Sequence, residues 1–186
     1  MKQVRGFTIV ELMVTLGIMA IVFAMAIPSF EGMVKRNMVQ KVRDDLYSDL
    51  VLARSEAMAR NRQVTVCASA NASAAAPVCS TGATDWNTGW IVFSDTDGDR
   101  VQDKNVTNIP DDELIRVYTN ANQGDMQLKF SSALAQQNLT FDRLGRMSNG
   151  ANGTFWFCQT QIDYTAAIVV NGVGRAYNAD GDATQC

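Results

Sequence analysis

An apolar stretch near the N-terminus constrains this chain more than any other feature. No charged residue occurs from Leu12 to Ile27, Lys2 and Arg5 precede the stretch, and Glu11 is the one charge inside it. As a helix, residues 7–30 extend about 36 Å, which is enough to cross a hydrocarbon core of ~30 Å. A carboxylate at that depth costs a few kcal/mol unless it is paired. We therefore predict a transmembrane helix over residues 7–30 and a specific role for Glu11.

Two other interpretations of this stretch compete with that prediction. It could be an ordinary membrane anchor, or a secretory signal cleaved after Ala26, because Ala24-Met25-Ala26 has the small-x-small pattern of a signal-peptidase site. Against the signal, Glu11 interrupts the apolar region, and the helical pattern continues beyond Ala26. We therefore favour one longer helix.

The residues around the start of this stretch carry a family resemblance. A basic leader, Gly6-Phe7-Thr8, Glu11 at its fixed spacing and Pro28 in the apolar helix resemble the N-terminus of type IV pilins and type II secretion pseudopilins. The resemblance implies that a prepilin peptidase cuts after Gly6, so that residues 1–6 are a leader and Phe7 becomes N-methylated. It also implies that Glu11 faces the terminal amine of a neighbouring subunit.

Length and charge limit the classes of protein that remain. The 186 residues predict one domain plus its anchor, residues 31–186 forming the domain. Loss of residues 1–6 changes the net charge from −3 to −5, which opposes a general attraction to phosphate backbones. Without any histidine, histidine triads, histidine-ligated zinc and imidazole bases are excluded. We expect no enzyme and no cofactor.

The apolar pattern predicts that the helix continues to about Arg60. One face carries apolar residues at spacings of mostly four, namely Phe30, Val34, Met38, Val42, Leu46, Leu50, Ala53 and Ala57. Opposite charges four residues apart support it, in the pairs Glu31/Lys35, Lys41/Asp45 and Glu56/Arg60. Pro28 lacks an amide hydrogen, so it is expected to kink or locally melt the helix.

Beyond Asn61 the pattern changes to short strands separated by turn residues. The predicted strands are 63–67, 89–93, 114–118, 126–130, 139–141, 154–158 and 167–170, with a loop at 69–85, a turn at 144–146 and a polar tail after Gly174. With no further helical period, this predicts an α+β fold, in which a long N-terminal helix packs on a mostly antiparallel sheet.

Several later segments are similar to the GspH/FimT family of minor pseudopilins and minor pilins. They are Ala53 to Ala57, the Gly89 to Phe93 strand with its Asp-rich turn, Phe141-Asp142-x-x-Gly145-Arg146 and the late Val-x-x-x-Gly-Arg segment. The resemblance implies a minor pilin that primes pilus assembly at or near the tip and supports twitching motility or natural transformation. A type II secretion pseudopilin is the close alternative.

The resemblance also implies location and partners. The chain would cross the inner membrane once, with its domain in the periplasm until assembly. Its partners would be other minor pilins, the major pilin, prepilin peptidase and the inner-membrane assembly platform.

Four cysteines follow the membrane segment, which indicates an oxidising compartment. None lies in a C-x-x-C pair, and four cysteines permit three pairings. Proximity along the chain together with the family resemblance implies Cys67–Cys79 and Cys158–Cys186.

A carboxylate-rich loop is a candidate for calcium. Asp95, Asp97, Asp99 and Asp103 occupy positions 1, 3, 5 and 9, and hard cations prefer several such oxygens. An EF-hand loop would need glycine and glutamate where Arg100 and Val106 stand. Because Asp and Gly are also common turn formers, we interpret the loop as a turn and keep calcium as the alternative.

Arg175 is a candidate for DNA binding. Gly174-Arg175-Ala176-Tyr177 occupies the place of a Gly-Arg-x-Arg element in FimT-like DNA-uptake pilins, with Tyr177 replacing the second arginine. Arginine binds phosphate bidentately, but one arginine on an acidic domain makes DNA binding the less favoured function. The aromatic residues Trp86, Trp90 and 155–157 are expected in the core rather than on a stacking surface.

Overall fold

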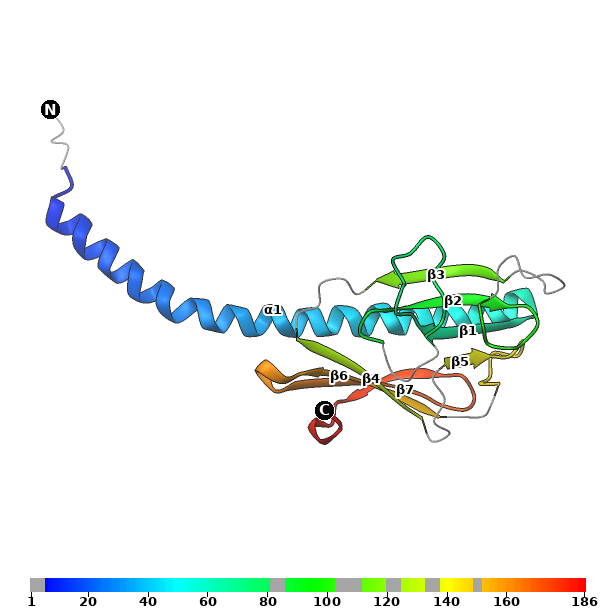
Figure 1. The fold of residues 1–186 in the computed structure, drawn as a ribbon. Helices are drawn as coiled ribbons and strands as arrows, with labels where there is room; N and C mark the ends of the chain where they lie inside the picture. Colours follow the sequence, from blue (N-terminus) through cyan, green and yellow to red (C-terminus); the bar gives the residue numbers. More distant parts are fainter. Residues whose placement is uncertain (1–5, 81–85, 103–111, 120–124, 133–137, 149–151) are drawn as a thin grey trace, which may run out of the picture. The chain divides into compact units, whose positions relative to one another are not determined.

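A computed structural model gives the fold in Figure 1. It describes residues 6–80, 86–102, 112–119, 125–132, 138–148 and 152–186, without the side chains of residues 25–29. The chain consists of two compact units, Met1–Asn37 and Met38–Cys186.

One helix, α1 (Ile9–Arg60), forms the first part of the described chain. Thr8 precedes it as an N-cap, because its hydroxyl accepts a hydrogen bond from the amide of Glu11 at 3.2 Å. At the other end Asn61 adopts a left-handed conformation with φ 52°, and the amide of Arg62 donates to the carbonyl of Ala57 at 3.3 Å. An asparagine in this conformation is a common helix terminator.

The helix runs without a break through Pro28, so the expected local melting is wrong. A proline removes one backbone hydrogen bond, and the turns on either side can keep their own. Among the residues whose side chains are described, no helical segment is both long enough and apolar enough to cross a membrane. The predicted transmembrane segment, 7–30, includes residues 25–29, whose side chains lie outside that described part.

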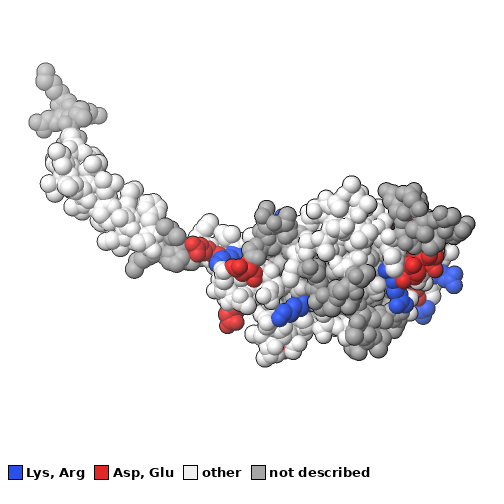
Figure 2. Space-filling view, viewed as in Figure 1, with Lys and Arg blue, Asp and Glu red and all other residues white. Residues whose placement is uncertain are grey.

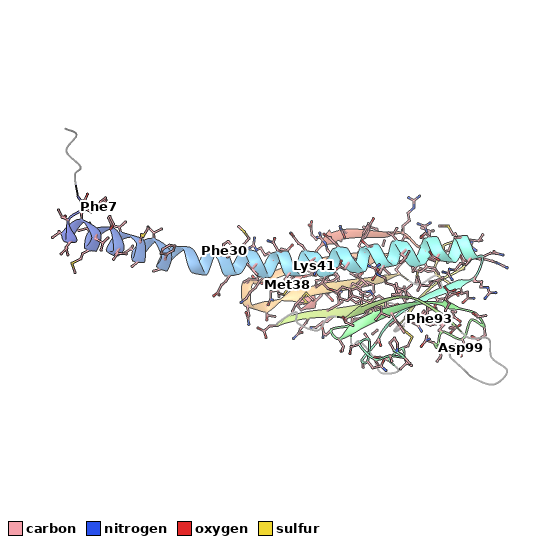
Figure 3. All side chains as sticks on the ribbon, turned by 90° about the horizontal axis from the view of Figure 1, so that it is seen from above. Phe7, Phe30, Met38, Lys41, Phe93 and Asp99 are labelled. Carbon is pink, nitrogen blue, oxygen red and sulfur yellow. A yellow bond between two sulfur atoms is a disulfide. The ribbon has the colours of Figure 1, made fainter. Side chains whose placement is uncertain are left out.

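The predicted apolar face is correct only from the middle of the helix onward. Of the predicted residues, Val42, Leu46, Leu50, Ala53 and Ala57 are buried, whereas Met38 is half-buried and its neighbour Val39 is buried instead. Phe30 and Val34 are instead 67% and 47% exposed. Both belong to the first unit, whereas Met38, labelled in Figure 3, is the first residue of the second. Of the three predicted ion pairs, Glu56–Arg60 is present at 2.5 Å.

Two four-stranded antiparallel sheets follow the helix, which confirms the α+β prediction. The first has the order β3-β2-β1-β5, from β1 (Gln63–Ala68), β2 (Gly89–Asp95), β3 (Glu113–Thr119) and β5 (Asn138–Phe141). The second has the order β4-β6-β7-β8, from β4 (Met126–Ser132), β6 (Gly153–Gln159), β7 (Tyr164–Val170) and β8 (Ala176–Asp180).

The core contains residues of both sheets and the apolar face of the helix from Val39 onward. Strand β2 is buried along its whole length. Trp90 and Val92 belong to the main core. Ile91 and Phe93 form a smaller cluster with Cys67 of β1, against which Cys79 packs from the following loop. Trp86, Trp90, Phe155 and Phe157 are fully buried, as predicted, and Trp156 is half-buried.

Three elements lie where only a polar tail or loop was expected. Strand β8 pairs with β7, and two short 3-10 helices occur at Thr160–Ile162 and Ala183–Gln185. The sequence of β8, Ala-Tyr-Asn-Ala-Asp, is polar because the strand lies at the sheet edge with both faces partly exposed.

Candidate functional site

The predicted processing and assembly residues lie at the start of α1. Phe7 is 76% exposed, and Glu11 is exposed in the first turn. Thr8 and Glu11 occupy the first and last positions of a Thr-x-x-Glu pattern, which is typical of a helix start. The positive end of the helix dipole also favours a carboxylate there. Local helix chemistry thus offers one reason for Glu11 besides a partner subunit.

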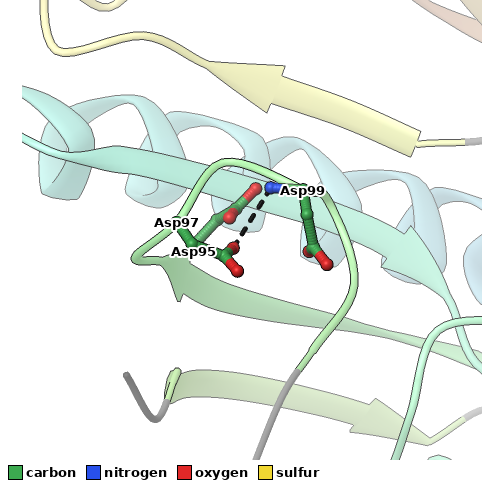
Figure 4. Close-up of side chains that lie close together, drawn as sticks. All are labelled: Asp95, Asp97 and Asp99. Carbon is green, nitrogen blue, oxygen red and sulfur yellow. Dashed lines mark hydrogen bonds between the residues drawn. The ribbon is translucent and has the colours of Figure 1, made fainter. Parts of the chain in front are cut away.

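The Asp-rich loop forms a turn closed by its own carboxylates (Figure 4). Buried Asp95 accepts hydrogen bonds from the amides of Gly98 at 2.7 Å and Arg100 at 3.1 Å, and from Thr65 Oγ1 at 3.1 Å. Exposed Asp97 accepts from the amide of Asp99 at 3.2 Å, and Asp99 accepts from Val101 at 2.7 Å. Each of these aspartates therefore has a role in the turn itself.

The same carboxylates also approach one another. One oxygen from each of Asp95, Asp97 and Asp99 lies within 4.8 Å of the others. Burial raises the pKa of Asp95, against the hydrogen bonds from Gly98 and Thr65. Asp103 lies outside the described residues. Because hydrogen bonds to amides account for the geometry, the turn interpretation is favoured over calcium.

Both disulfides have the pairing that the family resemblance implies. Cys67–Cys79 closes the loop after β1, and Cys158–Cys186 joins β6 to the C-terminal residue. Lys129 Nζ also donates to the carbonyl of Cys186 at 2.7 Å. The C-terminal segment is therefore attached to the second sheet at two points.

A tight loop follows β5. The amide of Asp142 donates to the carbonyl of Arg146 at 2.7 Å, and Gly145 donates back to the carbonyl of Asp142 at 2.8 Å. The Asp142 carboxylate accepts from the amides of Leu144 and Arg146, each at 2.9 Å, and its second oxygen lies 3.2 Å from Arg146 Nε. Burial opposes ionisation, but these hydrogen bonds and the Arg146 charge outweigh it and lower the pKa of Asp142.

The loop between β7 and β8 repeats this arrangement. The amide of Asn171 donates to the carbonyl of Arg175 at 3.0 Å, and Gly174 donates to the carbonyl of Asn171 at 2.8 Å. Asn171 Oδ1 accepts from the amide of Arg175 at 2.9 Å. Gly145 and Gly174 have φ values of 73° and 77°. Both loops thus use the pattern Asx-x-x-Gly-Arg, with asparagine replacing aspartate in the second.

The two loops lie directly against each other. A Cβ on Gly174 would lie 2.0 Å from the carbonyl oxygen of Gly145 and 3.2 Å from the Cα of Arg146. The amide of Met147 also donates to the carbonyl of Gly172 at 3.1 Å. The first loop in turn contacts α1, since a Cβ on Gly145 would lie 3.0 Å from Arg54 Nε. Arg175 is therefore next to Arg146, although the two are 29 positions apart in the sequence.

A cleft of about 590 Å³ runs beside the first loop. Its lining includes Arg143, Leu144 and Arg146 of the loop together with Asp95 and Asp97 of the acidic turn. On the face shown in Figure 2, acidic and basic side chains likewise gather side by side at one end of the second unit. This part of the surface is charged but mixed in sign.

The paired loops are the arrangement that sequence reasoning missed. The signal was present, because Asp142-x-x-Gly145-Arg146 and Asn171-x-x-Gly174-Arg175 share spacing and residue types. Their stacking is a tertiary contact, which the pattern alone does not specify.

Comparisons with known proteins identify relatives. A profile of the family described as type II transport protein GspH matches residues 43–174, and one of the prokaryotic N-terminal methylation motif matches residues 1–27. No protein with a curated description matches the chain in sequence.

Two crystal forms of one solved protein share the fold. The type IV minor pilin FimU of Pseudomonas aeruginosa aligns in one crystal form with a TM-score of 0.54 and 19% identity, over 80% of this chain and 92% of FimU. A second crystal form of FimU aligns with a TM-score of 0.50 and 18% identity, over 78% of this chain and 94% of FimU. The minor pseudopilin EpsH of the Vibrio cholerae type 2 secretion system has a TM-score of 0.47 and 11% identity, over 76% of this chain and 96% of EpsH.

Proposed function

Because the chain belongs to the GspH family of minor pilins and pseudopilins, we propose that it is a non-enzymatic subunit that primes assembly of a type IV pilus. It is incorporated at or near the pilus tip and supports twitching motility or natural transformation.

The observation that carries this proposal is the uncovered apolar surface of α1. Its large apolar residues between Phe7 and Phe23 are all more than half exposed, from Leu12 at 54% to Ile9 at 79%. So much exposed apolar surface is costly in water and indicates a membrane or a partner. The segment serves both, first as an inner-membrane anchor and then as a helix packed among other subunits.

Partners and processing follow from the same segment. Prepilin peptidase removes residues 1–6 and the Phe7 amine is methylated, which the matching methylation motif supports. The inner-membrane assembly platform then inserts the subunit beside other minor pilins and the major pilin. The periplasmic domain, residues 31–186, remains outside the membrane.

A secretion pseudopilus is the second candidate, favoured by the family's description as a type II transport protein. Neighbouring genes for minor pilins would support the pilus, whereas neighbouring secretion genes would support the pseudopilus. DNA uptake is a weaker alternative, for which the adjacency of Arg146 and Arg175 is the supporting observation.

Glu11 provides the test of assembly. Its own N-terminal amine, four residues away, lies about 6 Å along a straight helix, so a neighbour's Phe7 amine can approach more closely. Glu11→Ala is expected to leave membrane insertion and cleavage intact and to lower the ratio of subunit in sheared fibres to subunit in the membrane.

Two control variants separate charge from helix capping. Glu11→Gln keeps a polar side chain but removes the charge, so it is expected to behave like Glu11→Ala. Thr8→Ala removes the hydrogen bond to the Glu11 amide and keeps the carboxylate, so it is expected to assemble far better. An unchanged ratio in both Glu11 variants would refute the assembly role.

A further inference from the structure

The crests of the two stacked loops present side chains of the same kind. The third residue of each loop is a large apolar residue, Leu144 at 61% exposed and Val173 at 54%. The fifth is an exposed arginine, Arg146 or Arg175. Arg143 is also exposed. We call these five side chains the twin-loop surface.

Hydrogen bonds and close backbone contacts hold the twin-loop surface in place. Each loop is closed by backbone hydrogen bonds of 2.7–3.0 Å and by an Asx side chain. The buried Gly174 holds the loops in contact, and the second loop is fixed further because the amide of Gly172 donates to Asn152 Oδ1 at 2.7 Å. A surface held in this way loses little conformational entropy when a partner binds.

The charge of the surface contrasts with that of the whole protein. Within the described part of the chain, neither Arg143 nor Arg175 has a side-chain ion pair or hydrogen bond, while Arg146 pairs with Asp142. The surface itself therefore carries three arginines on a chain whose net charge is −3, and the carboxylates beside it are those of Asp142 and, in the neighbouring cleft, Asp95 and Asp97. Complementarity favours carboxylates in a partner.

We propose that the twin-loop surface docks an acidic segment of a different pilin subunit, one in which carboxylates flank an apolar side chain. This inference rests on the proposed function. The carboxylates pair with Arg143 and Arg175, and the apolar side chain packs on Leu144 and Val173. Arginine is enriched at protein interfaces, whereas phosphate contacts use hydrogen-bond donors and gain little from exposed leucine and valine.

The docked segment lies on the crests of the loops rather than in the neighbouring cleft. Asp95 and Asp97 also line that cleft. These carboxylates repel an acidic segment, so they direct it towards the side of the surface formed by Arg175.

Site-specific photocrosslinking tests the proposal in cells that assemble the fibre. A benzophenone amino acid replaces Leu144 or Val173 in the full chain, and Val78, which is 47% exposed on the Cys67–Cys79 loop, is the control position. We expect crosslinks from 144 and 173, and far fewer from 78. Peptide mass spectrometry should place them in a different processed pilin subunit, beside aspartate or glutamate.

Charge variants decide whether the arginines bind the partner. Arg143→Glu with Arg175→Glu is expected to lower the crosslink yield by roughly fivefold or more, and the matched double lysine variant to retain most of it. Because both side chains are exposed, we expect the variants to fold normally, and an unchanged melting temperature would verify this. If the double variant folds poorly, the crosslink yield of Arg175→Glu alone is measured instead.

Several results would overturn the proposal. They are crosslinks insensitive to charge reversal, equal yields at Val78, crosslinks only to a second copy of this chain, and no crosslinks. Tight binding of the full chain to a short DNA duplex, lost in Arg175→Ala, would assign the surface to nucleic acid instead. If the chain is absent from sheared fibres the proposed function fails and docking fails with it, whereas a chain present without crosslinks at 144 and 173 refutes docking alone.

Discussion

Asp49 of α1 accepts a hydrogen bond from Trp90 Nε1 of β2 at 2.8 Å, and both side chains are buried. Arg116 Nε of β3 lies 3.3 Å from the second oxygen of Asp49. The Tyr118 ring stacks on Trp90 with centroids 3.9 Å apart. One buried carboxylate thus joins the helix to two strands of the first sheet.

Asp49→Asn is expected to change the pH dependence of stability. Burial raises the pKa of Asp49, against the lowering effects of the Trp90 hydrogen bond and Arg116. The folded state therefore binds a proton more readily than the unfolded state, so this residue's contribution falls as pH rises through the raised pKa. The wild type should gain stability relative to Asp49→Asn as pH falls from about 7 to about 3. Denaturant unfolding across that range measures the difference.

Asp49→Ala is the matched comparison at neutral pH. Asparagine can still accept the Trp90 hydrogen bond, whereas alanine leaves the buried indole N–H unpaired, which costs about 1–3 kcal/mol. Two results would contradict this account of Asp49. One is an equal loss of unfolding free energy in Asp49→Asn and Asp49→Ala, and the other is a stability difference between wild type and Asp49→Asn that does not change with pH.

Gly174→Ala is expected to destabilise the second unit strongly. A Cβ there would overlap the Gly145 carbonyl, and φ is 77°. Gly98→Ala is the control, because φ is 83° but the nearest atom to its Cβ would be 3.5 Å away. Gly98→Ala should cost about 1 kcal/mol from backbone strain, and Gly174→Ala about 3 kcal/mol or more. Similar unfolding free energies for both variants would show that the loops separate easily.

The purified protein is expected to contain no free thiol. Peptide mapping should recover Cys67–Cys79 and Cys158–Cys186. Replacing either pair with serine should lower the free energy of unfolding by ~3 kcal/mol in the chain-entropy model, somewhat more for Cys158–Cys186, which closes the longer loop. A bridge between Cys67 and Cys158 would contradict the pairing.

Mass spectrometry of the mature chain is expected to find methylated Phe7 as its first residue, because the methylation motif matches residues 1–27. Gly6→Leu, which alters the cut site and leaves the apolar helix intact, should leave the leader attached. A mature chain beginning at Ile27 would instead indicate an ordinary secretory signal.

Local patterns predicted most of the elements. Seven strands follow from β-branched and aromatic runs such as 89–93, and Ala53 and Ala57 lie on the predicted helix face. Strand β8 was missed because a polar edge strand has no strong apolar pattern. Phe30 and Val34 fit the helical period equally well, but periodicity does not show where the covering domain begins.

The candidate site was less predictable. Arg175 was identified as a single arginine, and its position beside Arg146 depends on the close contact between Gly174 and Gly145. The carboxylate spacing of Asp95, Asp97 and Asp99 was visible, but their hydrogen bonds to the turn depend on backbone conformations such as the φ of 70° at Arg100. Both features come from three-dimensional packing.

The buried face of α1 has a mechanical consequence for a subunit under tension. Its six core residues extend from Val39 to Ala57, over about five helical turns. A pull along this part of the helix loads those contacts in shear, so they must yield together rather than peel apart one at a time. The helix also leads through Asn61 and Arg62 into β1, which is paired on both sides. Tension that reaches the end of the helix therefore enters a central strand of the sheet rather than an edge.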